Sequence, residues 1–195
     1  MSETVTMTPS LWTRMSNPGH FMRWSGKAVP WLTALSLAAL RPHVGRGERT
    51  ALRIGEGEAF LVDESYNANP ASMRATLGQL GRTPARRRVA VLGAMKELGS
   101  HGPDFHAALA APLRDAGVDY AVLVGPEMAP LADELGKAVP NALGKPLAFA
   151  HADGVQQAIA TLRAFGLERD DAILVKGSNS VGLASLVAAL SKREG

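Results

Sequence analysis

An acid, a tyrosine and two asparagines lie within seven residues, from Asp63 to Asn69, directly after the apolar stretch 59–62. A carboxylate can hold a ribose or an amine through charge-assisted hydrogen bonds. The carboxamides of Asn67 and Asn69 each offer a donor and an acceptor. A structural alternative is that both asparagines form Asx-turns and cap a helix beginning at Pro70. The density of polar groups favours a ligand-binding loop.

A second polar run, KGSNS at residues 176–180, follows another apolar stretch. Backbone N–H groups at a helix N-terminus attract anions, and a lysine adds a point charge, so a carboxylate or phosphate would suit this position. The alternative is that Ser178 or Ser180 is a plain N-cap. An N-cap explains one serine but not the whole run.

The segment DESYNANPASM, which starts at Asp63, resembles the motif that opens the C-terminal domain of Mur ligases. It is most similar to the branch that adds D-alanyl-D-alanine to the UDP-N-acetylmuramoyl tripeptide. Further pieces of the family pattern lie in the expected order along the chain. GRGER, from Gly45, precedes this segment, and VLGAMKELGSH from Val91, LVG from Leu123 and VKGSNSVG from Val175 come after it. The resemblance covers about residues 34–193.

This resemblance implies a cytoplasmic, ATP-dependent, amide-forming ligase of peptidoglycan synthesis, and thus a role in the cell wall, cell shape and cell division. ATP and Mg²⁺ serve the full-length family, and the substrates are D-alanyl-D-alanine and a UDP-muramoyl peptide. The nucleotide-binding residues implied are Arg46, Asp63, Asn67 and Asn69. The residues implied for the dipeptide are Lys176, Ser178 and Asn179, of which Lys176 and Ser178 would face its carboxylate.

The sequence also departs from the family pattern. It contains no G-x-x-x-x-G-K-[ST] motif, so we expect the chain alone to be inactive, to hold no catalytic residue and to bind no cofactor tightly. An ATPase domain acting in trans is then an implied partner. Ala94 replaces an aspartate, while Asn179 and Val181 replace an arginine and a methionine of KGSRSM, which weakens any carboxylate clamp.

Two other functions stay open. The chain could be a non-catalytic module that binds a nucleotide or dipeptide, from a truncated or split gene. It could also be a Rossmann-like cofactor enzyme, although the sequence lacks the G-x-G-x-x-G fingerprint. Lys96 and Glu97, in the loop after the apolar run 87–93, are interpreted as a solvated ion pair in a tight turn.

Strands are predicted at residues 50–54, 59–63, 87–93, 120–125, 146–150 and 171–176, and helices at 71–80, 101–116, 126–138, 153–165 and 181–191. Gly81 is a predicted C-cap and Asp153 a predicted N-cap. The alternation predicts an α/β fold over residues 41–195, namely a three-layer, doubly wound, mostly parallel sheet. The loops after Val62 and Val175 should share its carboxyl edge, so that their polar side chains line one concave surface.

Residues 1–40 are predicted to be a poorly structured segment with a short helix at 28–40. The apolar run within it contains Pro30 and is too short to span a membrane, so no membrane partner is expected.

Composition excludes several other classes. The net charge is only +3, and the arginines at positions 82, 86, 87 and 88 are interpreted as a solvated loop, so no nucleic-acid partner is expected. The absence of cysteine excludes disulfides and thiolate sites. His101 and His106 are five residues apart, a spacing that does not form an H-x-x-x-H metal pair.

Overall fold

The computed structural model describes residues 45–137 and 139–192. The predicted helix at 28–40 and the predicted domain boundary at residue 41 lie outside these ranges. The strands are β1 Glu48–Ile54, β2 Gly57–Glu64, β3 Arg87–Gly93, β4 Tyr120–Val124, β5 Ala148–Ala152 and β6 Asp171–Lys176. The helices are α2 Pro70–Arg82, α3 Gly102–Ala107, α4 Ala110–Asp115, α5 Ala129–Leu135, α6 Val155–Phe165 and α7 Leu183–Ser191. Short 3₁₀ turns lie at Gly99–His101, Pro126–Met128 and Asn179–Val181.

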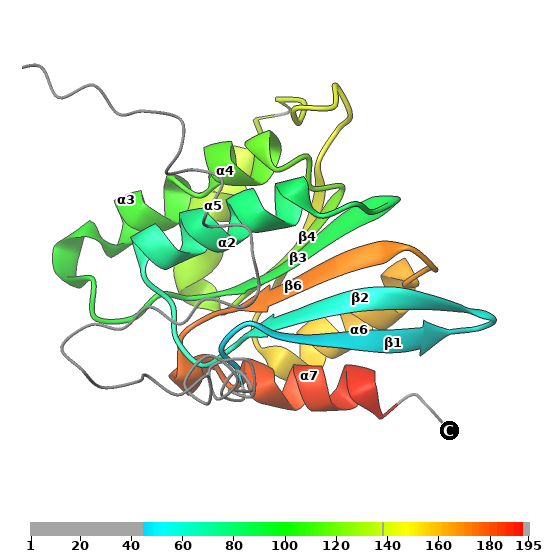
Figure 1. Ribbon diagram of the computed structural model, residues 1–195. Coiled ribbons are helices and arrows are strands. Elements are labelled where there is room, and N and C mark those ends of the chain that lie inside the picture. The colour runs from blue at the N-terminus through cyan, green and yellow to red at the C-terminus, as the bar shows by residue number, and fades with distance from the viewer. Residues whose placement is uncertain (1–44, 138, 193–195) are drawn as a thin grey trace, which may run out of the picture. The chain divides into compact units, whose positions relative to one another are not determined.

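The six strands form one sheet in the order β1-β2-β6-β3-β4-β5 (Figure 1). Strand β1 is antiparallel to β2, and the other neighbouring strands are parallel. The predicted doubly wound, mostly parallel sheet is therefore confirmed.

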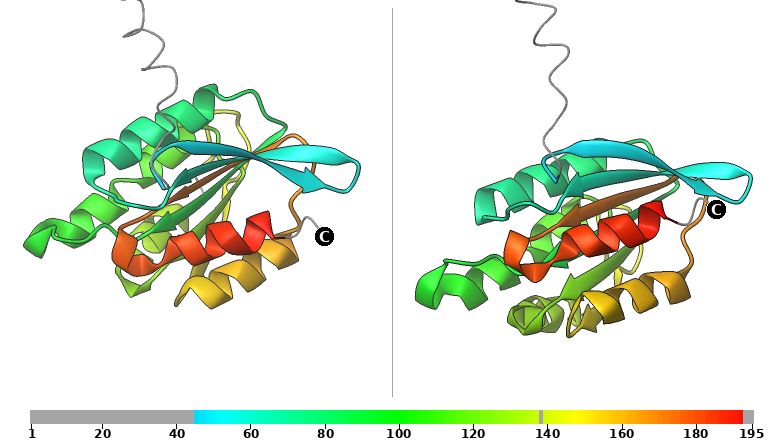
Figure 2. Two further views of the ribbon diagram at one scale, coloured as in Figure 1. Left: turned by 60° about the horizontal axis from the view of Figure 1, so that its bottom comes forward. Right: turned by 90° about the horizontal axis from the view of Figure 1, so that it is seen from below.

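Helices cover both faces of this sheet, as the strand sequences require. Every residue of β6 is buried, and so are residues 89–93 of β3, which explains the unbroken apolar runs at residues 172–175 and 89–92. Helices α2, α4 and α5 pack on one face against side chains such as Leu92 and Leu174, and α3 packs against α5. Helices α6 and α7 lie side by side on the other face, against Val91 and Val175 (Figure 2).

Prolines explain where the observed helices differ from the predicted ones. The predicted helix at 101–116 is divided, because Pro112 has no N–H to donate to Ala108 and its ring obstructs that carbonyl. Pro112 instead lies in the first turn of α4, where proline is tolerated. The helix predicted at 126–138 likewise becomes a 3₁₀ turn followed by α5, with Pro130 in the first turn of α5.

Three smaller predictions were wrong. Gly81 is not a C-cap, because α2 continues to Arg82; instead a Cβ at Gly81 would lie 2.9 Å from the Cα of Ala116, the C-cap residue of α4. Asp153 does not cap α6, whose N-cap residue is Gly154. The strand predicted at 146–150 is displaced to β5, because the side chain of Asn141 holds the preceding residues in a turn.

In the arginine cluster Arg82 and Arg86 are exposed, as predicted, but Arg87 and Arg88 are not solvated. Arg87 is half-buried and donates from Nε to Asp171 Oδ1 over 2.8 Å and from Nη2 to Asp171 Oδ2 over 2.6 Å. Its guanidinium lies 4.6 Å from the centroid of the Phe165 ring. Arg88 donates to the backbone oxygens of Leu80 and Thr83. The contacts of Arg87 join the amino ends of β3 and β6, and those of Arg88 join β3 to the end of α2.

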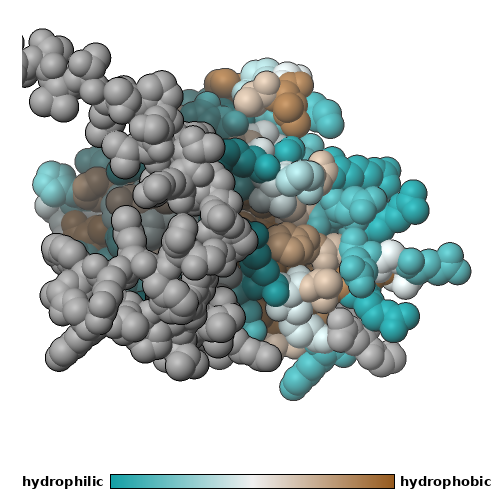
Figure 3. All heavy atoms as spheres, in the orientation of Figure 1, coloured by the Kyte–Doolittle hydropathy of each residue, from teal (hydrophilic) through white to brown (hydrophobic). Residues whose placement is uncertain are grey.

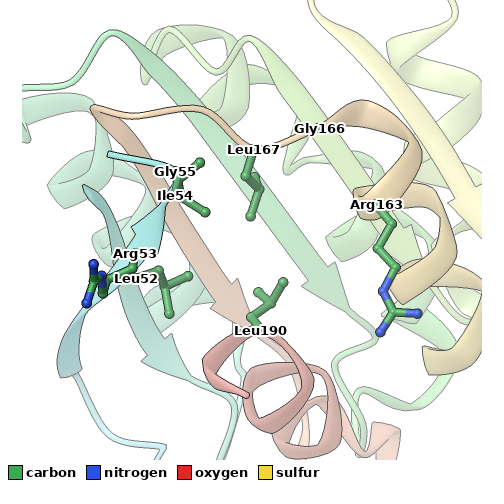
Figure 4. A pocket seen from close by; sticks show the side chains of 8 residues that line it. All are labelled: Leu52, Arg53, Ile54, Gly55, Arg163, Gly166, Leu167 and Leu190. Atoms are coloured by element: carbon green, nitrogen blue, oxygen red, sulfur yellow. The ribbon is translucent and has the colours of Figure 1, made fainter. Parts of the chain in front are cut away.

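The surface away from the candidate site has two further features. Hydrophilic residues line the edge where the β1–β2 hairpin turns, with apolar residues gathered further in (Figure 3). A cavity of about 220 Å³ lies at the amino edge, where Leu52, Ile54, Leu167 and Leu190 line it (Figure 4). In the part of the chain that the structure describes, no helix has the length and apolar character needed to cross a membrane.

Candidate functional site

The predicted loops do meet at the carboxyl edge of the sheet. Strands β2 and β6 are parallel neighbours, with Asp63 opposite Val175. After these strands the chain continues into α2 on one face and into α7 on the other. A crevice between strand ends forms where successive connections leave on opposite faces, and this is where open α/β sheets bind ligands.

Asp63 is buried at this edge rather than exposed to solvent, with 4% of its surface accessible. Its Oδ1 accepts a hydrogen bond from the Ser65 N–H over 2.9 Å, and its backbone oxygen accepts from the Gly47 N–H over 2.8 Å. The Tyr66 N–H donates to the Gly45 oxygen over 3.1 Å. Asp63 therefore helps to attach the segment before β1 to the loop after β2.

Arg46 is exposed on this attached segment and lies over the ring of Tyr66. Its guanidinium carbon is 4.2 Å from the ring centroid, which is a cation–π geometry. The flanking Gly45 and Gly47 have φ of 75° and 74°, a region in which only glycine is free of strain. The two glycines thus let the chain turn so that a cation is presented beside the loop.

The two asparagines have different positions. Asn69 is the N-cap of α2: its Oδ1 accepts from the Ser72 N–H over 2.8 Å, and its own N–H donates to Ser72 Oγ over 3.1 Å. The structural alternative therefore describes Asn69. Asn67 is exposed, and its Oδ1 accepts from the next N–H, that of Ala68, over 2.8 Å.

Lys176 is almost completely buried, with 2% of its surface accessible. Its Nζ donates to the backbone oxygen of Asn67 over 2.8 Å and lies 3.5 Å from a carboxylate oxygen of Glu64. Burial lowers the pKa of Lys176, and the charge and hydrogen bond of Glu64 oppose this shift. Lys176 thus connects β6 to the loop after β2, and it does not line an open concave surface as the sequence predicted.

Ser178 makes a similar connection to the loop after β3. Its Oγ accepts from the Lys96 N–H over 3.0 Å, and its N–H donates to the Ala94 oxygen over 3.1 Å. It is buried and makes no side-chain capping bond, whereas Asn179 is exposed. Of the predicted dipeptide residues, Asn179 is the one that solvent reaches.

Sequence reasoning missed a cleft of about 440 Å³ between the loops after β3 and β4. At this cleft Lys96 forms an ion pair with Glu127, so the interpretation of Lys96 and Glu97 as a pair was wrong. Glu97 has a φ of 63°, which gives the loop a sharp local turn. One signal could have identified Glu127: like Asp63 and Lys176, it lies close to the carboxyl end of a parallel strand.

His106 lines the same cleft and is buried. Its Nε2 accepts a hydrogen bond from the Met95 N–H over 2.9 Å, so in the neutral ring the proton is on Nδ1. Burial lowers the pKa of His106, and the backbone of Gly102 offsets part of this shift. Nδ1 is buried, and the Gly102 backbone that offsets the shift is close to it, but no hydrogen bond of ordinary geometry joins them.

Comparisons with known proteins point to one family. The family model described as Mur ligase, glutamate ligase domain, matches residues 45–179. The UDP-N-acetylmuramoyl-tripeptide–D-alanyl-D-alanine ligase of Synechocystis is 37% identical over 133 residues, covering 68% of this chain and 28% of that protein. The enzyme of the same name from Mycobacterium tuberculosis is 34% identical over 180 residues, covering 85% and 34%.

A solved structure has the same fold. The MurF ligase of Thermotoga maritima in complex with ADP superposes with a TM-score of 0.61 at 26% identity, covering 81% of this chain and 33% of that one. The chain thus spans about a third of the length of the relatives it matches.

Proposed function

The chain belongs to the Mur ligase family, whose C-terminal domain it carries, and from this premise we propose that it binds D-alanyl-D-alanine for ATP-dependent amide formation on the UDP-N-acetylmuramoyl tripeptide. The observation that supports this most is the joining of three ligand-facing loops at one edge. Lys176 connects the loops after β6 and β2, and Ser178 connects those after β6 and β3. A nucleotide and a dipeptide bound at this edge would therefore contact loops that are held together by hydrogen bonds.

In this proposal the segment before β1 and the loop after β2 contact the nucleotide. Arg46 is an exposed cation that fits a phosphate, and Asn67 is exposed and directly follows Tyr66, over whose ring Arg46 lies. Asp63 and Asn69 act by holding the loop, through the Ser65 N–H and the first turn of α2 respectively. ATP, when bound with Mg²⁺, supplies the phosphoryl group that activates the acceptor carboxylate.

The described residues do not provide a metal site of their own, since no group of three or more His, Asp or Glu side chains is gathered there. The sequence also contains no P-loop motif. We assign to this chain the positioning of ligands. We place this role in the cytoplasm, where ATP is supplied. Activation of the carboxylate is assigned to an ATPase domain that acts together with it.

We expect the 195-residue chain to bind ADP without hydrolysing ATP. Because it supplies only one side of the nucleotide site, the affinity should be about millimolar, or ~4 kcal/mol. Titration followed by ¹H–¹⁵N NMR should shift the signals of residues 45–47 and 63–69, and Arg46→Met should weaken binding. Arg169→Met, at the opposite edge of the sheet, is the matched control. Shifts confined to the amino edge, or ATP hydrolysis by the purified chain, would contradict this assignment.

A further inference from the structure

A small apolar cavity at the amino edge of the sheet, here called the amino-edge cavity, lies away from every loop assigned above. Its walls are the side chains of Leu52 and Ile54 from β1, Leu167 from the segment before β6, and Leu190 from α7 (Figure 4). Leu52 and Leu190 belong to the core cluster beneath α6 and α7, and the other two pack against it. The cavity is therefore a recess that reaches from the surface toward this core.

The size of the amino-edge cavity suits one small molecule. Its volume is about 220 Å³, whereas a cavity of ~150 Å³ lined by similar side chains is enough to hold benzene. Walls of leucine and isoleucine offer no hydrogen-bond partners to water. A ring or a branched chain of about six carbons would pack against these walls and remove their apolar surface from water.

Two glycines keep the mouth of the cavity open. Gly55 lies in the turn between β1 and β2 with a φ of 60°, and Gly166 follows α6 with a φ of 71°. Both values lie in the region that favours glycine. A Cβ added at either position would meet no other part of the described chain within 4 Å. A small molecule can thus enter without displacing a side chain at these two positions.

One arginine lies along the cavity with its charge available. Arg163, in the last turn of α6, extends along the side opposite β1 (Figure 4). It is exposed, and it forms no ion pair with another described residue. The guanidinium of Arg53 points away from the cavity, because Leu52 faces inward and side chains alternate along a strand. None of the described side chains that line the cavity is acidic.

The charge of a ligand belongs at the rim of the cavity rather than inside it. Burying a carboxylate among leucines is costly. The carboxyl end of α6, which carries a partial negative charge, also lies beside the cavity. At the rim, Arg163 can donate two parallel hydrogen bonds to a carboxylate. The recess therefore fits a molecule with an apolar body and a single carboxylate at one end.

We propose that the amino-edge cavity binds a small monocarboxylate, with its ring or branched body between Leu52, Leu167 and Leu190 and its carboxylate on Arg163. The site does not depend on the proposed function, because it lies at the edge of the sheet opposite the loops that follow β2, β3 and β6. A ligand there contacts three elements that are distant in the sequence, so its binding should raise the thermal stability of the chain.

The test is a ¹H–¹⁵N NMR titration of the full chain with benzoate, its neutral analogue benzamide, and acetate. Benzoate should shift the signals of residues 52–55, 163–167 and 190 and raise the melting temperature. Benzamide keeps the ring but lacks the charge, and should bind roughly tenfold more weakly. Acetate keeps the charge but lacks the ring, and should shift none of these signals at about 10 mM.

Three variants separate the contribution of the charge from that of the walls. Arg163→Met should lower the affinity for benzoate roughly tenfold, to that for benzamide, and leave benzamide binding unchanged. The matched control is Arg53→Met, which removes an arginine whose guanidinium points away from the cavity and should leave both affinities unchanged. Leu167→Phe, at a half-buried position, should fill part of the cavity and weaken the binding of both ligands.

Other outcomes would overturn the inference. Benzoate shifts confined to other residues, or no shifts at about 10 mM, would exclude the cavity as a binding site. Equal affinities for benzoate and benzamide, or an effect of Arg53→Met as large as that of Arg163→Met, would exclude the assignment of the carboxylate to Arg163. The ADP shifts at residues 45–47 and 63–69 belong to the proposed function and are expected whichever result is obtained here.

Discussion

Replacing Asp171 by asparagine should lower the free energy of unfolding by about 3 kcal/mol, because Arg87 loses its buried carboxylate partner and keeps only its ion pair with the partly exposed Glu168. The Asp171 side chain is completely buried and receives three short hydrogen bonds, two from Arg87 and one of 2.7 Å from the Glu168 N–H. An amide cannot accept all three, so a donor must face a donor. The effect is measured by urea unfolding.

Asp170→Asn is the matched control for this change. Asp170 is the adjacent residue, it is exposed, and its φ of 63° is one that asparagine tolerates. Its unfolding free energy should stay within ~0.5 kcal/mol of the parent value. If Asp171→Asn were equally mild, the contacts between Arg87 and Asp171 would not be what holds the amino ends of β3 and β6 together.

Replacing Gly177 by alanine should destabilise the chain by about 1–3 kcal/mol and also weaken ligand binding, because the loops after β3 and β6 would be forced apart. A Cβ on Gly177 would lie 2.7 Å from Leu183 Cδ1 and 3.0 Å from the Cα of Gly93. The backbone of Gly93 cannot move without displacing the end of β3. Thermal unfolding and the ADP and D-alanyl-D-alanine titrations measure the two consequences.

Gly136→Ala provides the control for Gly177→Ala. Gly136 has helical φ and ψ, and an added Cβ would meet only ordinary contacts, with backbone oxygens at 3.5 Å. Alanine there should preserve stability or raise it slightly. A Gly177→Ala variant with parent-like stability and affinity would show that the close approach of the two loops is not required.

The sequence predicted the sheet well because the decisive signals are local. The apolar runs of β3 and β6 mark strands covered on both faces, and their alternation with helices implies parallel pairing. The division between α3 and α4 was missed because Phe105, Leu109 and Leu113 keep a four-residue spacing across it. Leu109 and Leu113 face the core as the spacing indicates, whereas Phe105 is exposed. The spacing does not show whether the backbone hydrogen bonds continue, and Pro112 interrupts them.

The candidate site was predicted only in outline, since its contacts join distant parts of the chain. The sequence indicates that the loops after β2 and β6 share an edge, but it cannot show that Lys176 turns inward. The partner of Lys176 is the backbone oxygen of Asn67, 109 residues away, and every residue carries such an oxygen. The pair of Lys96 and Glu127 likewise spans 31 residues and two strands.

The central claim is that this domain performs the role of the C-terminal domain in a D-alanyl-D-alanine-adding ligase. The most direct measurement is amide formation by a chimera, in which residues 45–195 replace the corresponding region of the Synechocystis relative. The account predicts ATP-dependent addition of D-alanyl-D-alanine to the UDP-N-acetylmuramoyl tripeptide. A folded, ATP-binding chimera that forms no amide would contradict it, provided that the relative's own domain, rejoined at the same junction, is active.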